Sequence, residues 1–499
     1  MAGLSFSGGI GISCRFSGST ICRLNDLREF CAEINSMKYI PLLLWLLPSL
    51  FSDAQETSAR VFTAEELRED LDFWQDFLER KHPLLYLYQS KASIDSCFAS
   101  IRQQIAGPMD EREFYLLLAP LAAFIQDGHN SITPSERWME TLRESEFLFP
   151  LQLAYSGGKL YVSQNLSGET APPPGAEIIA IGDIPAGEIV NSIWPLLVRE
   201  GHSIQLPLSS LVKIFRFYYH LLYGVREEYP VVWRGANGEA YSTMVKGRTL
   251  AAIQEAASAL QEGNEAGIRL EIIDSLGAGV LTMRSFHPPT IRKQYKMHFR
   301  KEISGHFRQL QQAGVSGLVL DLRGNEGGNP AYVRFALQYL FDKPFTQAAS
   351  CRVVKKRNAS DFFERTRKTW YPAYGIGTFS PKRNSFKGDL VVLTDEGTFS
   401  AGVIMAGVLK KHRRAVVVGR ETGGNPVIMA GYLIKTSWEL PHTRLQIAPG
   451  TLCTIYEELS QNTGSGLIPD YLVNIVQEDI TGAKDTCLEF ALGLIMKGR

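Results

Sequence analysis

Three short apolar runs in the carboxy-terminal half of the chain constrain its fold more than any other feature. They cover residues 317–321, 388–393 and 415–419, and each has the length of a strand that is buried on both faces. Segments with a helical pattern lie between them, and such alternation is typical of an α/β domain. The sequence therefore predicts an α/β domain over residues 268–499. The helices expected within it cover residues 291–313, 331–341 and 401–412.

The chain before residue 250 divides into two parts of different character. Helical patterns over residues 63–80, 93–105 and 110–126 predict a helical domain at residues 60–146. Residues 147–249 instead contain short alternating runs separated by Gly, Pro and Asn. This pattern predicts a small β-rich middle domain.

The beginning of the chain resembles an export signal. Residues 37–54 combine a basic start, an apolar middle and small residues before a cut after Ala54, as secretory signal peptides do. The apolar part is shorter than the roughly 20 residues that cross a bilayer, so no stable membrane span is expected. We expect residues 1–36 to be a spurious amino-terminal extension, with a real leader of unknown role as the alternative. The predicted location is extracytoplasmic, either periplasmic or secreted.

Composition excludes several classes of partner and cofactor. Lys plus Arg and Asp plus Glu are both 52, so the net charge is zero, whereas nucleic-acid binding needs a basic face. The cysteines after the signal segment show no C-x-x-C spacing, and the histidines show no H-x-x-x-H spacing. We therefore expect no nucleic-acid partner, no metal and no other cofactor. One disulfide is possible in an oxidising compartment, but its pairing stays open.

A glycine-rich turn follows the first of the three apolar runs. The segment Asp321-Leu-Arg-Gly-Asn-Glu-Gly-Gly-Asn329 holds three glycines before the next expected helix. Such a turn lets backbone N–H groups approach a ligand closely and point at negative charge. Taken alone, it is equally consistent with an ordinary connection between a strand and a helix.

Ser400 occupies a second junction between a strand and a helix. There its hydroxyl lies near the positive end of the helix dipole, and the N–H of Ala401 has no partner within the helix. This arrangement suits a nucleophile that carries its own donor for an oxyanion. The alternative is that Ser400 simply caps the helix, as serines often do.

Together these segments resemble a known family. The D-L-R-G-N-x-G-G turn, the T-x-S-A segment at residues 398–401, G-R-E-T-G-G at 419–424 and G-L-I-P-D-Y-L-V at 466–473 resemble the S41 serine peptidases. These comprise tail-specific (C-terminal) processing proteases and the tricorn-type core. The resemblance implies a ClpP/crotonase-like α/β spiral catalytic domain, preceded by the helical domain and by a middle domain that is PDZ-like at most. It also implies a peptide or protein substrate.

The resemblance assigns roles to the two junctions. Ser400 would be the nucleophile. The N–H of Ala401 and that of either Gly327 or Gly328 would form the oxyanion hole, and the choice between the two glycines stays open.

The resemblance also indicates the base. Processing proteases use a lysine shortly after the G-x-x-T-x-G segment, but this chain has Asn425 there, which cannot accept a proton. The tricorn-like branch uses a histidine from an upstream D-G-H segment, and this chain has Asp127-Gly128-His129. His129 is therefore the predicted base, since an imidazole suits proton transfer near neutrality. The alternative is a histidine favoured at a helix carboxyl terminus.

The resemblance to tricorn-type proteins also implies a supporting acidic residue downstream. Glu457 and Glu458 lie in the corresponding region, and spacing favours Glu458 as the catalytic acid, with a solvated acidic pair as the alternative. The serine that adjoins the histidine in tricorn-type proteins is missing, and Asn130 stands at that position. Asp321 and Arg323 are expected to brace the glycine turn rather than to take part in chemistry.

The sequence thus predicts a secreted or periplasmic serine-type peptidase that hydrolyses peptide bonds through an acyl-enzyme on Ser400. Two alternatives remain. One is a non-catalytic ligand- or peptide-binding protein on the same fold. The other is an esterase that shares the acyl-enzyme chemistry. Substrate preference and oligomeric state stay open.

Overall fold

The computed structural model describes residues 60–145, 147–261, 267–369, 375–432 and 436–497. The predicted signal peptide and the extension before it lie outside the described residues. Residues 59–499 form one compact unit. None of the described helices is long and apolar enough to cross a membrane.

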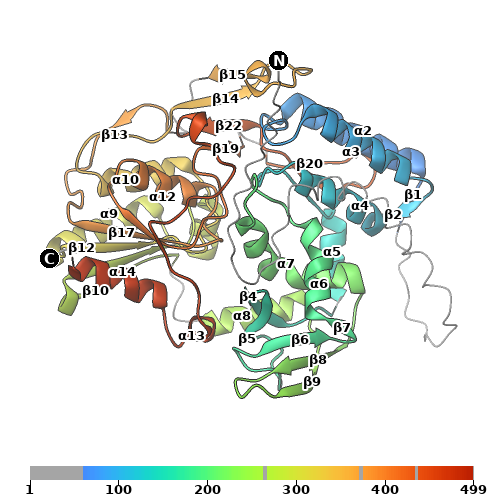
Figure 1. Ribbon diagram of the computed structural model, residues 1–499, viewed down its shortest axis with the longest axis horizontal. Coiled ribbons are helices and arrows are strands. Elements are labelled where there is room, and N and C mark those ends of the chain that lie inside the picture. Colours follow the sequence, from blue (N-terminus) through green and yellow to red (C-terminus); the bar gives the residue numbers. More distant parts are fainter. Residues whose placement is uncertain (1–59, 146, 262–266, 370–374, 433–435, 498–499) are drawn as a thin grey trace, which may run out of the picture. The chain divides into compact units, whose positions relative to one another are not determined.

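A six-stranded sheet forms the centre of the carboxy-terminal half (Figure 1). Its neighbours pair in parallel, except that the edge strand β10 is antiparallel to β11. The three predicted strands are confirmed, because β12, β17 and β18 lie side by side with largely buried residues. In spatial order the strands are β10 Ile268–Ile273, β11 Ala278–Met283, β12 Gly317–Asp321, β17 Asp389–Thr394, β18 Val416–Gly419 and β23 Tyr471–Leu472.

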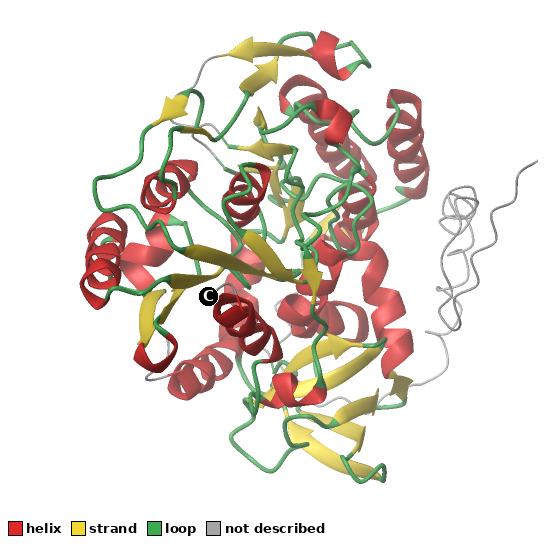
Figure 2. Ribbon diagram, turned by 60° about the vertical axis from the view of Figure 1, so that its left-hand side comes forward, coloured by secondary structure: helices red, strands yellow, loops and turns green. Residues whose placement is uncertain are grey.

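Helices cover both faces of this sheet (Figure 2). One face packs against α9 (Phe299–Ala313), α10 (Pro330–Leu340) and α12 (Ala401–Lys411) in a single apolar cluster. The other face packs against α14 (Thr486–Lys497). The α/β prediction is therefore confirmed. The helix predicted from residue 291 begins later, because residues 290–294 form a separate π-helical turn.

The amino-terminal part is helical, as predicted. Thr63 caps α2 in a capping box with Glu66, whose backbone N–H and side chain complete the reciprocal bonds. The three helices are α2 Ala64–Lys81, α3 Lys91–Gln104 and α4 Glu111–Phe124. The connected short strands and helix are β1 Val61–Phe62, β2 Met109–Asp110, β3 Ser131–Thr133 and α5 Glu136–Ser145.

The middle part contains the expected antiparallel sheet together with a long helix that the sequence pattern did not reveal. The strands are β4 Leu151–Ser156, β5 Lys159–Asn165, β6 Glu177–Ile181, β7 Ile184–Pro185, β8 Glu228–Arg234 and β9 Ala240–Lys246. The helices are α6 Ala186–Ile193, α7 Gln205–Tyr223 and α8 Leu250–Gln261. Helix α7 is rich in aromatic and β-branched residues, which favour strands, and its burial against the sheet overrides that propensity.

One apolar core joins the helical and middle parts. Leu71 and Leu118 of the helices belong to the same buried cluster as Val162 and Ile178 of the middle sheet. Leu445, from the carboxy-terminal half, also belongs to it. The proposed boundary at residue 146 thus crosses a continuous core, and the division into separate domains stays a prediction.

Two smaller sheets connect distant parts of the chain. Strand β21 pairs with β3, directly after the D-G-H segment, so residues 446–448 lie beside residues 131–133. The second sheet has the order β15-β14-β22-β19. The remaining elements are β13 Phe345–Thr346, β14 Ser350–Val354, α11 Phe362–Arg365, β15 Thr366–Thr369, β16 Thr378–Phe379, β19 Ile428–Gly431, β20 Trp438–Glu439, β21 Gln446–Ala448, β22 Leu452–Ile455 and α13 Gln477–Thr481.

Candidate active site

Ser400 lies at the sharp turn between β17 and α12. Its backbone has φ 49° and ψ −120°, a left-handed conformation that a residue with a side chain adopts only at a cost of about 1–3 kcal/mol. Its side chain makes no capping bond to the helix that follows. Instead, its Oγ lies 3.0 Å from Nε2 of His129. The alternative that Ser400 simply caps the helix therefore lacks the hydrogen bond that it requires.

His129 reaches Ser400 from a position 271 residues earlier in the chain. Helix α4 ends at Phe124, and the D-G-H segment then turns into β3, which β21 holds in place. The imidazole stacks on the ring of Phe399 with 4.8 Å between centroids. The hydroxyl of Tyr432 donates to the His129 carbonyl oxygen at 2.9 Å. The ring is thus fixed on one face and its backbone is anchored.

The glycine of the D-G-H segment is required by packing. A Cβ on Gly128 would lie 2.8 Å from both the Phe399 ring and the Leu206 side chain. Any side chain at this position would push Phe399 away and loosen the platform on which His129 stacks.

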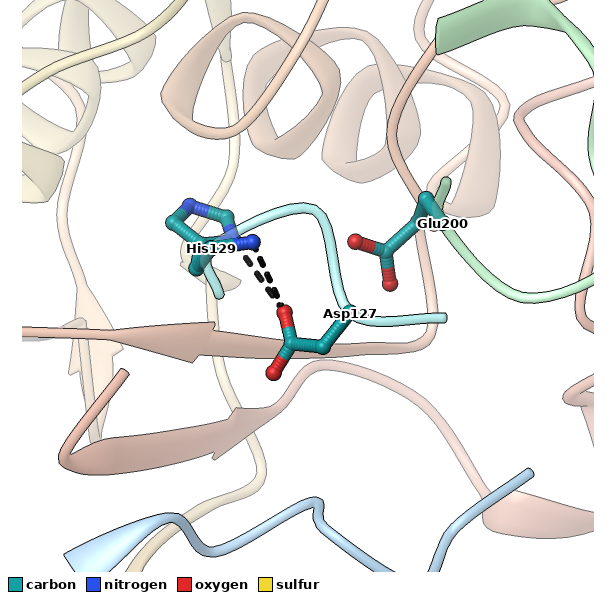
Figure 3. Close-up of side chains that lie close together, drawn as sticks. All are labelled: Asp127, His129 and Glu200. Carbon is teal, nitrogen blue, oxygen red and sulfur yellow. Dashed lines mark hydrogen bonds and ion pairs between the residues drawn. The ribbon is translucent and has the colours of Figure 1, made fainter. Parts of the chain in front are cut away.

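His129 is nearly enclosed, with 8% of its surface exposed. Burial lowers its pKa, and the negative charge of Asp127 opposes this only in part. Oδ1 of Asp127 accepts the backbone N–H of His129 at 2.8 Å and lies 3.8 Å from Nδ1 of its ring (Figure 3). The imidazole is therefore held mainly neutral near pH 7, the form that can accept a proton.

Two further buried groups flank Asp127. Nε2 of His82 lies 3.2 Å from its Oδ2, and Glu200 approaches from the segment after residue 196 (Figure 3). Burial acts to raise the pKa of Asp127, but contacts with His82 and His129 outweigh it and hold that pKa below its usual value. Burial, reinforced by the charge of Asp127, raises the pKa of Glu200 well above its usual range. Asp127 is thus the charged member of the pair and Glu200 the neutral one.

Asp127, His129 and Glu200 are residue types that can bind a metal ion. Within the described residues they form the one group of three potential ligands, with ligand atoms within 4.8 Å of one another. One oxygen of Glu200 accepts the Gly128 N–H at 2.9 Å, and Oδ1 of Asp127 accepts the His129 N–H at 2.8 Å. The other carboxylate oxygens and Nδ1 of His129 have no hydrogen-bond partner among the described residues. The group is therefore a buried polar network that backbone N–H groups hold at two of its oxygens.

The glycine turn lies against Ser400. A Cβ on Gly327 would lie 2.6 Å from both Cβ of Ser400 and the backbone nitrogen of Ala401. The Asn325 carbonyl accepts the Phe399 N–H at 2.9 Å, which fastens the two junctions together. The turn thus approaches the serine closely only because it carries glycine there.

The two glycines differ in what their N–H groups do. Gly327 donates to Oδ1 of Asn325 at 2.9 Å, so this N–H is occupied. The N–H groups of Gly328 and Ala401 have no hydrogen-bond partner among the residues that the structure describes. Two unused donors therefore remain near this contact: the Ala401 N–H, next to Ser400 in the chain, and the Gly328 N–H, next to Gly327 in the chain.

Asp321 and Arg323 brace this turn, as expected. The Arg323 guanidinium donates to both oxygens of Asp321, at 2.9 Å each, and to both oxygens of Asp485, at 2.8 and 2.7 Å. Such paired charge-assisted bonds are strong and geometrically specific. They link the end of β12 to the start of α14.

The remaining predicted positions lie outside the contact between serine and histidine. Asn425, which replaces the lysine of the processing proteases, is buried, accepts the Val427 N–H and donates to the Tyr88 hydroxyl. Glu458 is exposed, and no described hydrogen bond or ion pair joins it to His129 or Ser400. Its catalytic role stays a prediction, as does that of Glu457. The buried Asn130 amide has no hydrogen-bond partner among the described residues.

Sequence reasoning missed His82 and Glu200. Neither residue lies near the D-G-H segment in sequence, so no spacing signal could have joined them.

Comparisons with known proteins point to one family. Residues 277–470 match the model of peptidase family S41. Over 136 residues the chain is 30% identical to carboxy-terminal processing protease CtpB of Bacillus subtilis. The matched region covers 27% of this chain and 24% of that protein. Over 208 residues it is 26% identical to the carboxyl-terminal-processing protease of Synechocystis. That matched region covers 41% of this chain and 43% of the relative. The chain thus spans less than half the length of these curated relatives.

Solved structures extend the likeness of the fold to most of the chain. Mature CPAF aligns with a TM-score of 0.64 and 14% identity, covering 87% of this chain and 98% of that chain. Mature CPAF complexed with lactacystin aligns with a TM-score of 0.63 and the same identity. The helical and middle parts therefore share the fold of that structure, and the predicted fold class is confirmed.

Proposed function

We propose that this protein is a serine-type peptidase that cleaves peptide bonds through an acyl-enzyme on Ser400, with His129 as the general base. The single observation that carries the proposal is the 3.0 Å separation of Ser400 Oγ from His129 Nε2. This is hydrogen-bond distance, and it joins a nucleophile to a base across two halves of the chain. The S41 domain supports the same reaction class.

The reaction follows from the geometry. Ser400 Oγ attacks the substrate carbonyl carbon while its proton moves to His129 Nε2, and the carbonyl oxygen becomes an oxyanion. Collapse of this intermediate breaks the C–N bond, and His129 returns the proton to the leaving amine. Water then attacks the acyl-enzyme by the same route, which releases the acid and restores Ser400.

The oxyanion would be held by the N–H groups of Gly328 and Ala401. The Ala401 N–H directly follows Ser400, and the Gly328 N–H directly follows Gly327, which packs against Ser400. Both lack partners among the described residues, whereas the Gly327 N–H is occupied by Asn325. We therefore assign Gly328, the third glycine of the turn, as the donor. Removal of one such donor typically costs about 3–4 kcal/mol of transition-state stabilisation.

We also propose that the protein works outside the cytoplasm. The signal-like segment at residues 37–54 supports an extracytoplasmic, periplasmic or secreted protein. Amino-terminal sequencing of the native protein tests it. A mature terminus directly after Ala54 is expected, and a terminus within residues 1–36 would contradict both the cleavage and the spurious extension.

The activity is tested with Ser400→Ala and a panel of peptides and matched esters. We expect peptide hydrolysis by the wild-type protein and none by the variant, with unchanged melting of the fold. Ser385→Ala, which lies outside the site, is the matched control. Unchanged hydrolysis in S400A would refute the assignment. Cleavage of esters alone would indicate the esterase, and binding without cleavage would indicate the non-catalytic protein.

A further inference from the structure

His82 is held in one orientation at the end of α2. Its ring is fully buried, with 0% of its surface exposed. Its carbonyl oxygen accepts a bond from the Arg365 guanidinium at 2.9 Å, and Arg365 is itself buried in the carboxy-terminal half. The Leu84 N–H donates to Nδ1 of the ring at 3.1 Å. Both the backbone and the ring are therefore fixed.

These contacts determine the tautomer of His82. An Nδ1 that accepts a hydrogen bond carries no proton, so the ring proton resides on Nε2. Nε2 is the atom that lies 3.2 Å from Oδ2 of Asp127. His82 thus places its protonated ring nitrogen beside the buried carboxylate.

The other oxygen of Asp127 serves His129. For Nε2 of His129 to accept the proton of Ser400, the ring must carry its own proton on Nδ1. That proton faces Oδ1 of Asp127, which lies 3.8 Å away and already accepts the His129 backbone N–H at 2.8 Å. A shift of less than 1 Å would close a direct hydrogen bond.

His82 affects which of two buried carboxyl groups carries the negative charge. Asp127 and Glu200 are both buried with their oxygens close together, so both cannot carry charge at low cost. Nε2 of His82 lies 3.2 Å from Oδ2 of Asp127, whereas the described contact of Glu200 in this network is the Gly128 N–H. His82 therefore selects Asp127 as the charged carboxylate beside His129.

We propose that His82 is a positioning residue for the peptidase reaction, acting through Asp127 to hold His129 in the tautomer that accepts the Ser400 proton. This inference rests on the proposed function. It adds an acid, Asp127, and a second histidine to the pair of Ser400 and His129. It also gives helix α2, which ends beside His82, a part in positioning the proposed base.

The kinetic test compares His82→Leu with His82→Gln. Leucine removes the donor at similar volume, whereas the glutamine amide can place an N–H near the position of Nε2. We expect kcat of H82L to fall at least ~10-fold, part of the roughly 100- to 10,000-fold that a general base contributes, with KM nearly unchanged. H82Q should recover most of the loss. His220→Leu, another buried histidine outside this network, is the matched control for the change in packing.

The outcomes separate this inference from the proposed function. Wild-type protein whose Ser400 is not labelled by a fluorophosphonate would overturn both. Wild-type protein that is labelled, with H82L equally fast in labelling and turnover, would overturn the inference alone. H82Q as slow as H82L, with both folded, would also overturn it, because glutamine restores an N–H donor that leucine lacks.

A second measurement does not depend on the folding of H82 variants. In the ¹⁵N spectrum of histidine-labelled wild-type protein, His82 should show an unprotonated Nδ1 and a protonated Nε2. Its Nε2–H signal should shift in Asp127→Asn and stay in place in H220L. A proton on Nδ1, or no response to Asp127→Asn, would contradict the proposal.

Discussion

At the scale of single residues, the environment of His129 would set the pH dependence of the proposed reaction. Burial lowers its pKa from the usual 6.5, so the neutral, proton-accepting form persists to lower pH than for a free imidazole. We expect kcat/KM to remain high at pH 6.5 and to fall only as the pH drops through a value below it. A pH profile of peptide hydrolysis checks this, and an acid limb centred above 6.5 would contradict the account.

The backbone of Ser400 gives a second residue-scale prediction. Because its φ is 49°, a side chain is strained there and glycine is not. Ser400→Gly and Ser400→Ala should both be inactive, but the glycine variant should be more stable, by about 1 kcal/mol. Urea unfolding of the two variants measures the difference. Equal stability would show that the turn stores no strain.

Local sequence patterns predicted Ser400 and His129 as site residues. The structure places Oγ of Ser400 3.0 Å from Nε2 of His129. The choice between Gly327 and Gly328 could not be made from sequence, because it depends on the side chain of Asn325 folding back onto one N–H. His82 was equally out of reach, since its contact with Asp127 exists only once α2 packs beside the D-G-H segment.

At the scale of elements, helix caps are expected to stabilise the fold without changing the rate of the reaction. Thr63 and Glu66 bond reciprocally at the start of α2. Thr63→Ala should lower the free energy of unfolding by about 1 kcal/mol and leave kcat unchanged. Denaturant titration and peptide kinetics measure both quantities. A fall in kcat would mean that α2 affects His82 through its amino-terminal end as well.

Element predictions succeeded where one physical effect dominates. Strands β12, β17 and β18 are buried on both faces, so their sequences are continuous apolar runs. Helix α7 was missed because aromatic and β-branched residues favour strands locally, while tertiary packing decides otherwise. Helix α9 starts late because the π-helical turn at residues 290–294 interrupts the pattern.

At the scale of the whole described unit, contacts between the two halves assemble the site. Arg365 donates to the carbonyl oxygens of Glu79 and His82 at 2.9 Å each, and β21 pairs with β3. Arg365→Met would leave these buried acceptors without their donor. We expect a loss of roughly 3 kcal/mol of stability together with reduced kcat, measured by urea unfolding and peptide hydrolysis. Unchanged kcat in a destabilised variant would separate this contact from the site.

The central claim is that a histidine from the amino-terminal half activates a serine in the carboxy-terminal half. The rate at which a fluorophosphonate labels Ser400 measures that activation directly, in wild-type protein, in His129→Ala and in the control His202→Ala. The account predicts a fall of about 100-fold or more in H129A and no change in H202A. Equal labelling of Ser400 in wild-type protein and in H129A would contradict it.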